Sequence, residues 1–506
     1  MDRPTRKERL CVLAAICLAA LVLPLSFTAG AVATPAIGRE YNAAPAALAW
    51  ITNAFMLSFG SLLMAAGVLA DRYGRKRLFT SGLSLFVAVS ALLANATGIV
   101  ALDALRALQG VAAAAALASG SAALAQAFEG YARVRAFSLL GTTFGVGLTF
   151  GPLLCGALVE QFGWRSIFTV TASLAGVSLV AAATCMRESA NPNAGTLDVP
   201  GVISFSGMLT LLTGAIILGP RSGWHSLPVL SALAGAVICL AVFVAVELQG
   251  KNPMLNLRLF RQPRFVGVQI LPVGTCYCYI VLIVLLPLRL IGVEGATPLH
   301  SGLILLALSA PMLAVPLLAA QLNRRVGAGT LCAGGFLLAA AGLLFLGQLD
   351  LRDPVSLSLC LLVIGTGTGL PWGLMDGLAL SVVPVEQAGM AAGIFNTTRV
   401  AGEGIALAAT LAVLTALVDG NLAHQLPADL RNEWAQRLVM GDLGQAEGPL
   451  RALLLVAYKE GFATLTRMLA AVTVVAAGAS LLLLKRSGRD RGRSSSEPAP
   501  PARSLG

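Results

Sequence analysis

The chain has 506 residues, of which 57% are hydrophobic and 12% charged, and its mean hydropathy is +0.82. This composition excludes a water-soluble globular enzyme, because such proteins carry about 25% charged residues. A net charge of +11 could indicate binding to nucleic acid or to an anionic surface. In a membrane protein it could instead reflect cations retained on the cytoplasmic side, and the positions of Lys and Arg along the chain distinguish these explanations. Apolar blocks of about 20 residues, the length that crosses a bilayer as a helix, recur along the chain and indicate a polytopic helical membrane protein.

The apolar blocks predict fourteen spans separated by polar connections. Lys and Arg gather in the two terminal tails and in connections that follow even-numbered spans. The short connections on the other side contain only Arg39, Arg165, Arg221, Arg289 and Arg352. Because positive residues are retained on the cytoplasmic side, we expect both termini in the cytoplasm. The expected spans are 10–33, 47–70, 78–97, 99–125, 134–159, 165–186, 199–219, 226–248, 265–291, 299–322, 329–348, 354–382, 388–417 and 460–484.

The segments outside these spans are short, with two exceptions. Residues 418–458 form a long outer segment, and the amphipathic stretch 430–439 predicts a surface helix within it. Residues 485–506 are polar and rich in Pro and Ser, so we expect a disordered tail. The nine cysteines all fall inside apolar blocks and are expected to be core residues, not a disulfide framework.

A fixed pattern of glycines and charges follows the second span, where residues 67–77 read GVLADRYGRKR. The positive-inside rule accounts for cations here but not for the spacing of Gly67, Asp71 and Gly74. Glycines permit a tight turn, and Asp71 can pair locally or cap a neighbouring helix. The string resembles the cytoplasmic signature loop of the major facilitator superfamily of transporters.

A weaker echo follows the tenth span, where residues 320–327 read AQLNRRVG. Gly327 lies 253 residues after Gly74, and Arg324 stands where the first copy has its acid. Two parallel six-helix halves would place the echo here if spans seven and eight are inserted between them, and repeats of this kind imply a site at their interface. A chance match is the alternative.

The fourth and fifth spans contain further motifs of the same superfamily. Residues 102–114, LDALRALQGVAAA, place Arg106 inside the membrane, where we expect it to face the bundle interior or a wet cavity. The structural alternative is that Arg106 only bridges Asp103, one turn away. Residues 145–156, GVGLTFGPLLCG, resemble the fifth-helix motif of exporting antiporters, with small residues for close packing and a proline that bends the helix.

Three more stretches narrow the resemblance: 164–168 (WRSIF), 252–265 (NPMLNLRLFRQPRF) and 386–406 (EQAGMAAGIFNTTRVAGEGIA). Together they are similar to the fourteen-span drug:proton antiporter family. One departure is that the acid usual in the family's first helix is replaced in the string Ser26-Phe27-Thr28, which puts specificity for cationic drugs in doubt.

The resemblance implies an all-α polytopic membrane protein with the major facilitator fold, in which two six-helix halves flank two inserted central helices. Residues 1–9 would form a cytoplasmic tail. The expected domains are 10–186 for the first half, 199–248 for the inserted helices, 265–484 for the second half with outer loop 418–458, and 485–506 for the tail.

The implied function is export of small amphipathic molecules, such as drugs or antiseptics, by proton antiport with alternating access in the cytoplasmic membrane. A dedicated exporter of an endogenous metabolite or siderophore is the first alternative. A non-transporting sensor or a lipid enzyme is the remote one, since the three histidines have no metal or catalytic spacing. No ATP-binding loop is present. We expect no cofactor, no metal and no nucleic-acid partner, and a monomer in contact with lipid, protons and substrate, with periplasmic adaptor proteins as a further candidate partner.

Two groups of residues are predicted to move or bind ligand. Asp71 should lie close to Arg133 or Arg135 and lock the cytoplasmic side in one state. Large flat side chains suit varied amphipathic ligands, and spans one, two, nine and twelve should line the cavity. The predicted gate comprises Gly67, Asp71, Arg72, Gly74, Arg75, Arg133, Arg135, Gly147, Gly151 and Pro152, and the predicted cavity wall Trp50, Phe55, Tyr277, Trp372 and Asn396.

The proton site must be sought among the acids left inside the membrane. Glu403 lies 15 residues into the thirteenth span, about 22 Å along the helix, with Arg399 one turn earlier. An intramembrane acid is costly unless it is paired or neutral, so a changing distance between these two groups could bind and release a proton. A permanent Arg399–Glu403 salt bridge with a packing role is the alternative. Asp376 and Asp103, beside Arg106, are the other candidates.

Overall fold

The computed structural model describes residues 6–128, 130–190, 197–250, 255, 257–349, 353–382, 388–444 and 446–484. Within these ranges the regular structure is helical and contains no strand. Arg352 and the expected tail 485–506 lie outside the described residues.

Fourteen helical segments of the described chain are long and apolar enough to cross a membrane, which confirms the predicted number. The first six are α1 (Arg6–Tyr41), α2 (Pro45–Tyr73), α3 (Arg75–Ala94), α4 (Ile99–Ala127), α5 (Gly130–Phe162) and α6 (Arg165–Cys185). The next two are α7 (Val199–Ser222) and α8 (Leu227–Gln249).

The remaining spans include two composite ones. The ninth consists of α9 (Pro263–Thr275), η2 (Cys276–Ile280), α10 (Val281–Pro287) and η3 (Leu288–Val293). The tenth consists of α11 (Pro298–Ser309) and α12 (Pro311–Val326). The last four are α13 (Ala328–Leu346), α14 (Pro354–Ser381), α15 (Ala388–Asn421) and α17 (Gly448–Leu483). Two short helices, η1 (Leu257–Arg261) and α16 (Ala428–Val439), lie outside the spans.

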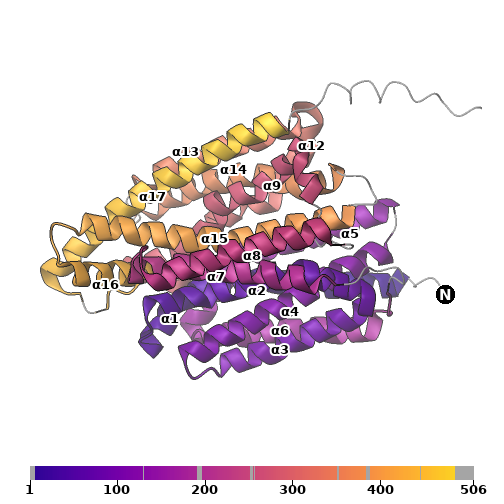
Figure 1. Ribbon diagram of the computed structural model, residues 1–506, viewed down its shortest axis with the longest axis horizontal. Coiled ribbons are helices and arrows are strands. Elements are labelled where there is room, and N and C mark those ends of the chain that lie inside the picture. The colour runs from indigo at the N-terminus through magenta and orange to yellow at the C-terminus, as the bar shows by residue number, and fades with distance from the viewer. Residues whose placement is uncertain are drawn as a thin grey trace, which may run out of the picture.

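The spans form two halves with a pair of helices at their seam (Figure 1). Helices α1–α6 pack on one another, and so do α9–α15 with α17. Helix α7 packs against α8 and also contacts α2 of the first half and α15 of the second. The start of α1 and the end of α17 lie at one end of the bundle, here called the terminal side, and α16 lies at the other end, here called the α16 side (Figure 1).

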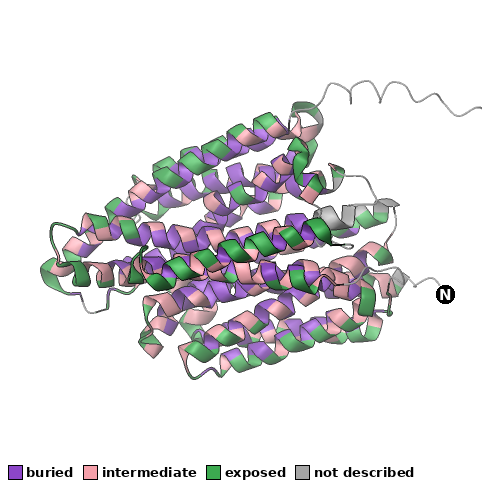
Figure 2. Ribbon diagram, viewed as in Figure 1, coloured by how far each residue is buried: buried purple, intermediate pink, exposed green. Residues whose placement is uncertain are grey.

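The outer faces of the bundle are apolar, which is what lipid contact requires. Helix α8 exposes Val237, Ile238, Leu240 and Val242, and exposed residues form continuous stripes along the peripheral helices (Figure 2). The ninth span lies at the opposite extreme, because side chains such as Leu282 and Leu285 are fully buried. The ninth span is therefore central and α8 peripheral.

Two glycines adopt the same left-handed turn at equivalent places in the two halves. Gly74 joins α2 to α3 with φ +112° and ψ 129°. Gly327 joins α12 to α13 with φ +87° and ψ 145°. A side chain is strained at such φ values, so both positions favour glycine. The weak sequence echo therefore corresponds to a repeated turn.

Three expectations about the α16 side and the cysteines can now be compared with the structure. The surface helix predicted at 430–439 is confirmed as α16. The last span begins at Gly448 and not near residue 460. Arg289 was counted with the outer connections although the expected span 265–291 contains it, and it lies in η3 with 3% exposure. It contacts the Phe462 ring at 4.1 Å and Glu294 at 3.5 Å.

One disulfide overturns the expectation that all cysteines are free. Cys11 and Cys185 are bonded, with their Cα atoms 6.1 Å apart. The start of α1 lies beside the end of α6 on the terminal side, and the Glu8–Arg187 ion pair at 2.8 Å joins the same two segments. Sequence separation hid this proximity.

Candidate functional site

A cavity lies between the two halves. Five aromatic rings, one methionine and one acid–base pair stand out in its wall. The first half contributes residues of α1, α2 and α5, and the second half contributes residues of η2, α14 and α15. The lining residues are Leu23, Pro24, Phe27, Phe55, Met56, Phe59, Phe144, Leu148, Ile280, Trp372, Arg399, Val400 and Glu403.

Helical spacing explains why these side chains share one wall. Phe55 and Phe59 stand four residues apart on α2, and their ring centroids are 5.7 Å apart. Phe144 and Leu148 repeat the spacing on α5, and Arg399 and Glu403 repeat it on α15. Residues four apart lie on one face of a helix, so each helix presents one stripe to the cavity.

Arg399 is the cation of the cavity wall. It is 8% exposed, and its guanidinium lies 5.4 Å from the centroid of Phe144 and 5.8 Å from that of Trp372. Its ion pair is with Asp376 of α14, at 3.8 Å between Nη1 and Oδ1. Its side chain donates no hydrogen bond to any described residue. Arg399 is therefore held by rings and one long ion pair, with donors still free.

Glu403 is the buried acid of the same wall, with 8% exposure. Among the described residues, neither a hydrogen bond nor an ion pair within 4.0 Å reaches its carboxyl group. The alternative of a permanent Arg399–Glu403 salt bridge is therefore wrong for this conformation, because Asp376 of another helix has taken the cation.

Asp376 differs from Glu403 in exposure. Its side chain is 61% exposed, and it lies five residues before the end of α14 at Ser381, on the terminal side. Arg399 therefore stands between an exposed acid at that side and a buried acid in the cavity.

Arg106 lies behind the cavity wall and is fully buried. Its Nε donates to the Ile51 carbonyl at 2.8 Å, and Nη1 donates to Ser26 Oγ at 3.2 Å and to Gln109 Oε1 at 2.5 Å. Its guanidinium lies 4.5 Å from the centroid of Phe55, which faces the cavity. The described hydrogen-bond acceptors of Arg106 are therefore neutral, and the first helix contributes a serine hydroxyl to them and not an acid.

Asp103 is not the ion-pair partner of Arg106. Within the described chain no ion pair joins them at 4.0 Å or less, and Asp103 Oδ1 is buried without a hydrogen-bond partner. The alternative that Arg106 only bridges Asp103 is therefore wrong, since the guanidinium turns toward α1 and α2 instead.

The predicted aromatic wall needs correction at two positions. The structure places Phe55 and Trp372 in the wall, whereas Trp50 packs beside Leu57 and Leu209, at the contact of α2 with α7. Tyr277 also lies away from the wall. It falls in η2, whose wider π-helical turns shift the register so that Tyr279 meets Trp372, with centroids 6.1 Å apart.

The remaining wall residues show which signals the sequence offered. Asn396 is half-buried on α15 but does not line the cavity. Phe27, Phe59 and Phe144 were missed, although Phe27 and Phe144 fall at or beside motif strings. Reading every fourth residue from Phe55 would have found Phe59.

The signature loop is closed on itself and on the end of α6. Asp71 pairs with Arg75 at 2.8 Å, and Arg75 also reaches Gln126 Oε1 at 2.5 Å. No ion pair of the described chain joins Asp71 to Arg133 or Arg135, so the predicted gate contact is wrong for this conformation. Arg133 instead donates to the Phe128 carbonyl at 3.0 Å.

The other gate residues of this loop have lesser contacts. Arg72 is exposed, with its guanidinium 5.5 Å from the ring of its neighbour Tyr73. A Cβ added at Gly67 would meet no atom within 4 Å. Close packing therefore does not explain Gly67 in this conformation.

Glu188 is a helix-capping residue that sequence reasoning missed. Its carboxyl oxygens accept hydrogen bonds from the backbone N–H groups of Lys76 and Arg77, both at 3.1 Å. A carboxylate at the first turn of α3 satisfies unpaired donors and complements the helix dipole. Asp71 was considered for this capping role, but Glu188 fills it.

The glycines of α5 allow close approach to neighbouring helices. A Cβ at Gly147 would meet the Leu21 carbonyl oxygen at 2.8 Å, and one at Gly151 would meet Thr28 Oγ1 at 2.7 Å. Pro152 lies against α11, where a Cβ at Gly302 would meet the Pro152 carbonyl oxygen at 2.7 Å. These residues therefore fix α5 against both α1 and the other half.

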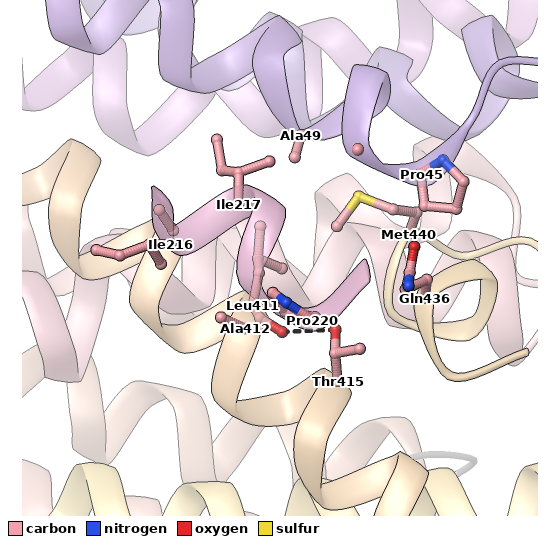
Figure 3. Close-up of a pocket in the computed structure, with 12 residues that line it drawn as sticks. Pro45, Ala49, Ile216, Ile217, Pro220, Leu411, Ala412, Thr415, Gln436 and Met440 are labelled. Carbon is pink, nitrogen blue, oxygen red and sulfur yellow. Dashed lines mark hydrogen bonds between the residues drawn. The ribbon is translucent and has the colours of Figure 1, made fainter. Parts of the chain in front are cut away.

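A second pocket lies at the seam on the α16 side (Figure 3). Its wall combines α2, α7, α15 and the end of α16, as Ala49, Ile217, Leu411 and Met440 illustrate (Figure 3). The lining is mainly apolar. The pocket marks where the first half, the inserted helix and the second half meet.

Comparison with known proteins identifies the family to which this chain belongs. A sequence profile of the Major Facilitator Superfamily matches residues 16–407. The chain belongs to this superfamily. It is 33% identical over 397 residues to the multidrug resistance protein Stp of Mycobacterium tuberculosis, covering 78% of this chain and 74% of that protein. It is 28% identical over 426 residues to the tetracenomycin C resistance and export protein of Streptomyces glaucescens, covering 84% and 78%.

Solved structures of the superfamily share the fold. A bacterial homologue of the human lysosomal transporter Spinster aligns over 95% of this chain and 97% of its own, with a TM-score of 0.65 and 14% sequence identity. This major facilitator protein is thus a multi-pass membrane protein with two six-helix halves and two inserted helices. In transporters built from such repeats, substrates bind near the midplane at the repeat interface, where the aromatic cavity lies.

Proposed function

We propose that this protein is a secondary active exporter of small amphipathic molecules, working by alternating access and proton antiport. The terminal side, which is richest in Lys and Arg, faces the cytoplasm in this proposal. The protein acts in the cytoplasmic membrane, with both termini inside the cell.

The cavity between the halves is the observation that carries this proposal. Its wall is dominated by aromatic and aliphatic groups, with one cation and one acid. Apolar pockets with few polar groups accept ligands of varied shape and orient them by those groups. The names of relatives, which include a multidrug resistance protein and an antibiotic export protein, support export as the direction.

Glu403 is the proposed proton-binding group. It is buried, faces the cavity and lacks a hydrogen-bond partner among the described residues. An unpaired carboxylate in such surroundings is unstable by several kcal/mol, so a proton or a cation must accompany it. The charged and titratable groups that the described chain places beside it are Arg399 on its own helix and Cys276 of η2.

A second candidate is an exporter dedicated to a metabolite made by the same cell. Relatives named for the export of tetracenomycin C and for actinorhodin transport support it. The same cavity serves both candidates, so a substrate panel that includes host metabolites separates them.

The test is transport into everted membrane vesicles that carry an imposed pH gradient. We expect Glu403→Gln to abolish accumulation driven by the gradient while downhill exchange of substrate persists. Glu433→Gln is the matched control, because Glu433 is an exposed acid on α16 paired with Arg437. Gradient-driven accumulation by Glu403→Gln at the normal rate would contradict the assignment, and loss of downhill exchange by the control would show that the assay reports folding.

A further inference from the structure

We propose that Asp376 passes the proton between Glu403 and water on the terminal side, while Arg399 pairs with whichever of the two carboxyl groups is ionised. The inference rests on the proposed function, in which Glu403 binds the proton. It adds a second acid to the proton path and names the side of the membrane on which the proton is released.

The first argument is the arrangement of one cation between two acids. Arg399 lies one helical turn from Glu403 on α15 and 3.8 Å from Asp376 of α14. No other ion pair of the described chain reaches these acids within 4.0 Å. The three groups are electrically neutral when one carboxyl holds a proton and the other is ionised beside Arg399. Because burial of uncompensated charge is costly, this shared-proton state is favoured.

The second argument is the contrast in exposure. Glu403 and Arg399 are both 8% exposed, whereas the side chain of Asp376 is 61% exposed. Asp376 lies near the terminal end of α14, and Glu403 lies 15 residues into α15. The pair therefore leads from the cavity to the terminal side.

The third argument is that the ion pair seen here defines one end of the exchange. Arg399 pairs with Asp376, which is the ionised acid in this arrangement, and Glu403 is unpaired and carries the proton. The Arg399 contact is long and its donors are not hydrogen-bonded to described residues. The guanidinium can therefore turn toward Glu403 without breaking a short hydrogen bond.

The exchange is a balanced proton transfer. The O–H bond of the Glu403 carboxyl breaks, and an O–H bond forms on a carboxylate oxygen of Asp376, directly or along water in the cavity. Arg399 leaves Asp376 Oδ1 and pairs with the new Glu403 carboxylate, so the net charge of the group is unchanged. Asp376 then releases its proton to water on the terminal side and is ionised again.

The experiment measures proton movement coupled to substrate in vesicles that contain the full chain. We expect Asp376→Asn to slow coupled proton movement about tenfold or more, with downhill substrate exchange and its KM unchanged. Asp376→Glu should restore much of the rate. A small diffusible acid, sodium formate, should also restore it in Asp376→Asn, because formate can accept and carry the proton. Formate should not rescue Glu403→Gln, which lacks the donor.

The matched control is Asp353→Asn on the same helix. Asp353 caps the other end of α14 by accepting from the backbone N–H of Val355 at 3.1 Å, and Asn is an equally good cap, so proton movement should stay normal. A normal rate in Asp376→Asn, or a slow rate that formate does not relieve, overturns the relay role. Gradient-driven transport by Glu403→Gln overturns the proposed function itself, so the two failures are distinguishable.

Discussion

The two ends of the bundle hold the halves together to different degrees. On the α16 side, a Cβ at Gly156 of α5 would collide with the Pro298 carbonyl oxygen of α11, and Gly302 lies against the backbone of α5. On the terminal side of the same helix, Gly141 has no atom within 4 Å of its Cβ position. Arg133 and Arg135 are exposed there, as is Asp376 across the cavity.

This difference between the two ends bears on the conformational state of the molecule. Backbones of the two halves are in contact on the α16 side, whereas charged residues on the terminal side are solvated. We infer from this contrast that α5 is packed more tightly against the other half on the α16 side than on the terminal side, as expected for one end state of rocking between rigid halves. The absence of an Asp71–Arg133 or Asp71–Arg135 contact among the described residues fits the same state, because the terminal side is not drawn together.

Helix α16 is attached to the second half, and we expect it to move with that half. Arg431 binds Asp419 of α15 at 2.8 Å, and Gly441, just after α16, lies against the Gly292 backbone. The same segment reaches α2 and α7 at the pocket of Figure 3. Opening on the α16 side must therefore separate Met440 from Ala49.

The largest effect is expected from linking those two positions. The double variant Ala49→Cys/Met440→Cys, treated with a bifunctional thiol reagent, should lose nearly all transport, because the α16 side can no longer open. If the reagent is a bis-methanethiosulfonate, which joins the two thiols through disulfide bonds, a reductant should cleave the link and restore transport. The control is Asp419→Cys/Arg431→Cys, which links two residues of the second half and should still transport after treatment. Full activity of the linked Ala49–Met440 pair would contradict the proposed opening.

A smaller effect is expected from filling one glycine of α5. Gly156→Val should destabilise the close contact of α5 with α11 on the α16 side by roughly 1–3 kcal/mol, the usual penalty for overpacking. A thiol reagent added from that side should then label Met56→Cys in the cavity faster. Gly141→Val, on the same helix, should not raise it, because its Cβ meets open space.

Labelling rates in intact cells, with each valine combined with Met56→Cys, check this contrast. Cells carrying only the native cysteines correct for background labelling. Equal increases with both valines would mean that the two ends do not differ as described.

Most of the fold was predictable because lipid imposes it. Long apolar helices are the structures that satisfy every backbone group in a bilayer, so hydropathy alone gives the spans. It failed at the start of α17, where residues 448–459 form helix but include Arg451 and Lys459. It also gave no account of how Arg289 is buried near the end of its span, because that depends on the aromatic rings of α17.

The sequence predicted which charged residues belong to the site, but it did not predict which of them pair with one another. Glu403, Arg399 and Asp376 stand out as charges inside spans, which are costly without function. Spacing suggested an Arg399–Glu403 contact, whereas the tertiary partner Asp376 comes from another helix. Glu188 gave no signal, since it caps a helix that begins 113 residues earlier, at Arg75. Contacts between distant segments are what local periodicity cannot supply.

The smallest expected effect separates Asp71 of the signature loop from Glu188, which caps the helix that follows this loop. Glu188→Ala removes two acceptors from the first turn of α3 and should lower the free energy of unfolding by about 1 kcal/mol, the usual worth of a helix cap. Asp71→Asn removes only the i,i+4 pair with Arg75, worth about 0.3–0.5 kcal/mol at a partly exposed site. Thermal unfolding of both variants in the same detergent measures the difference. If Asp71→Asn is as destabilising as Glu188→Ala, then Asp71 makes contacts beyond Arg75, and the terminal side is more tightly joined than its exposed charges indicate.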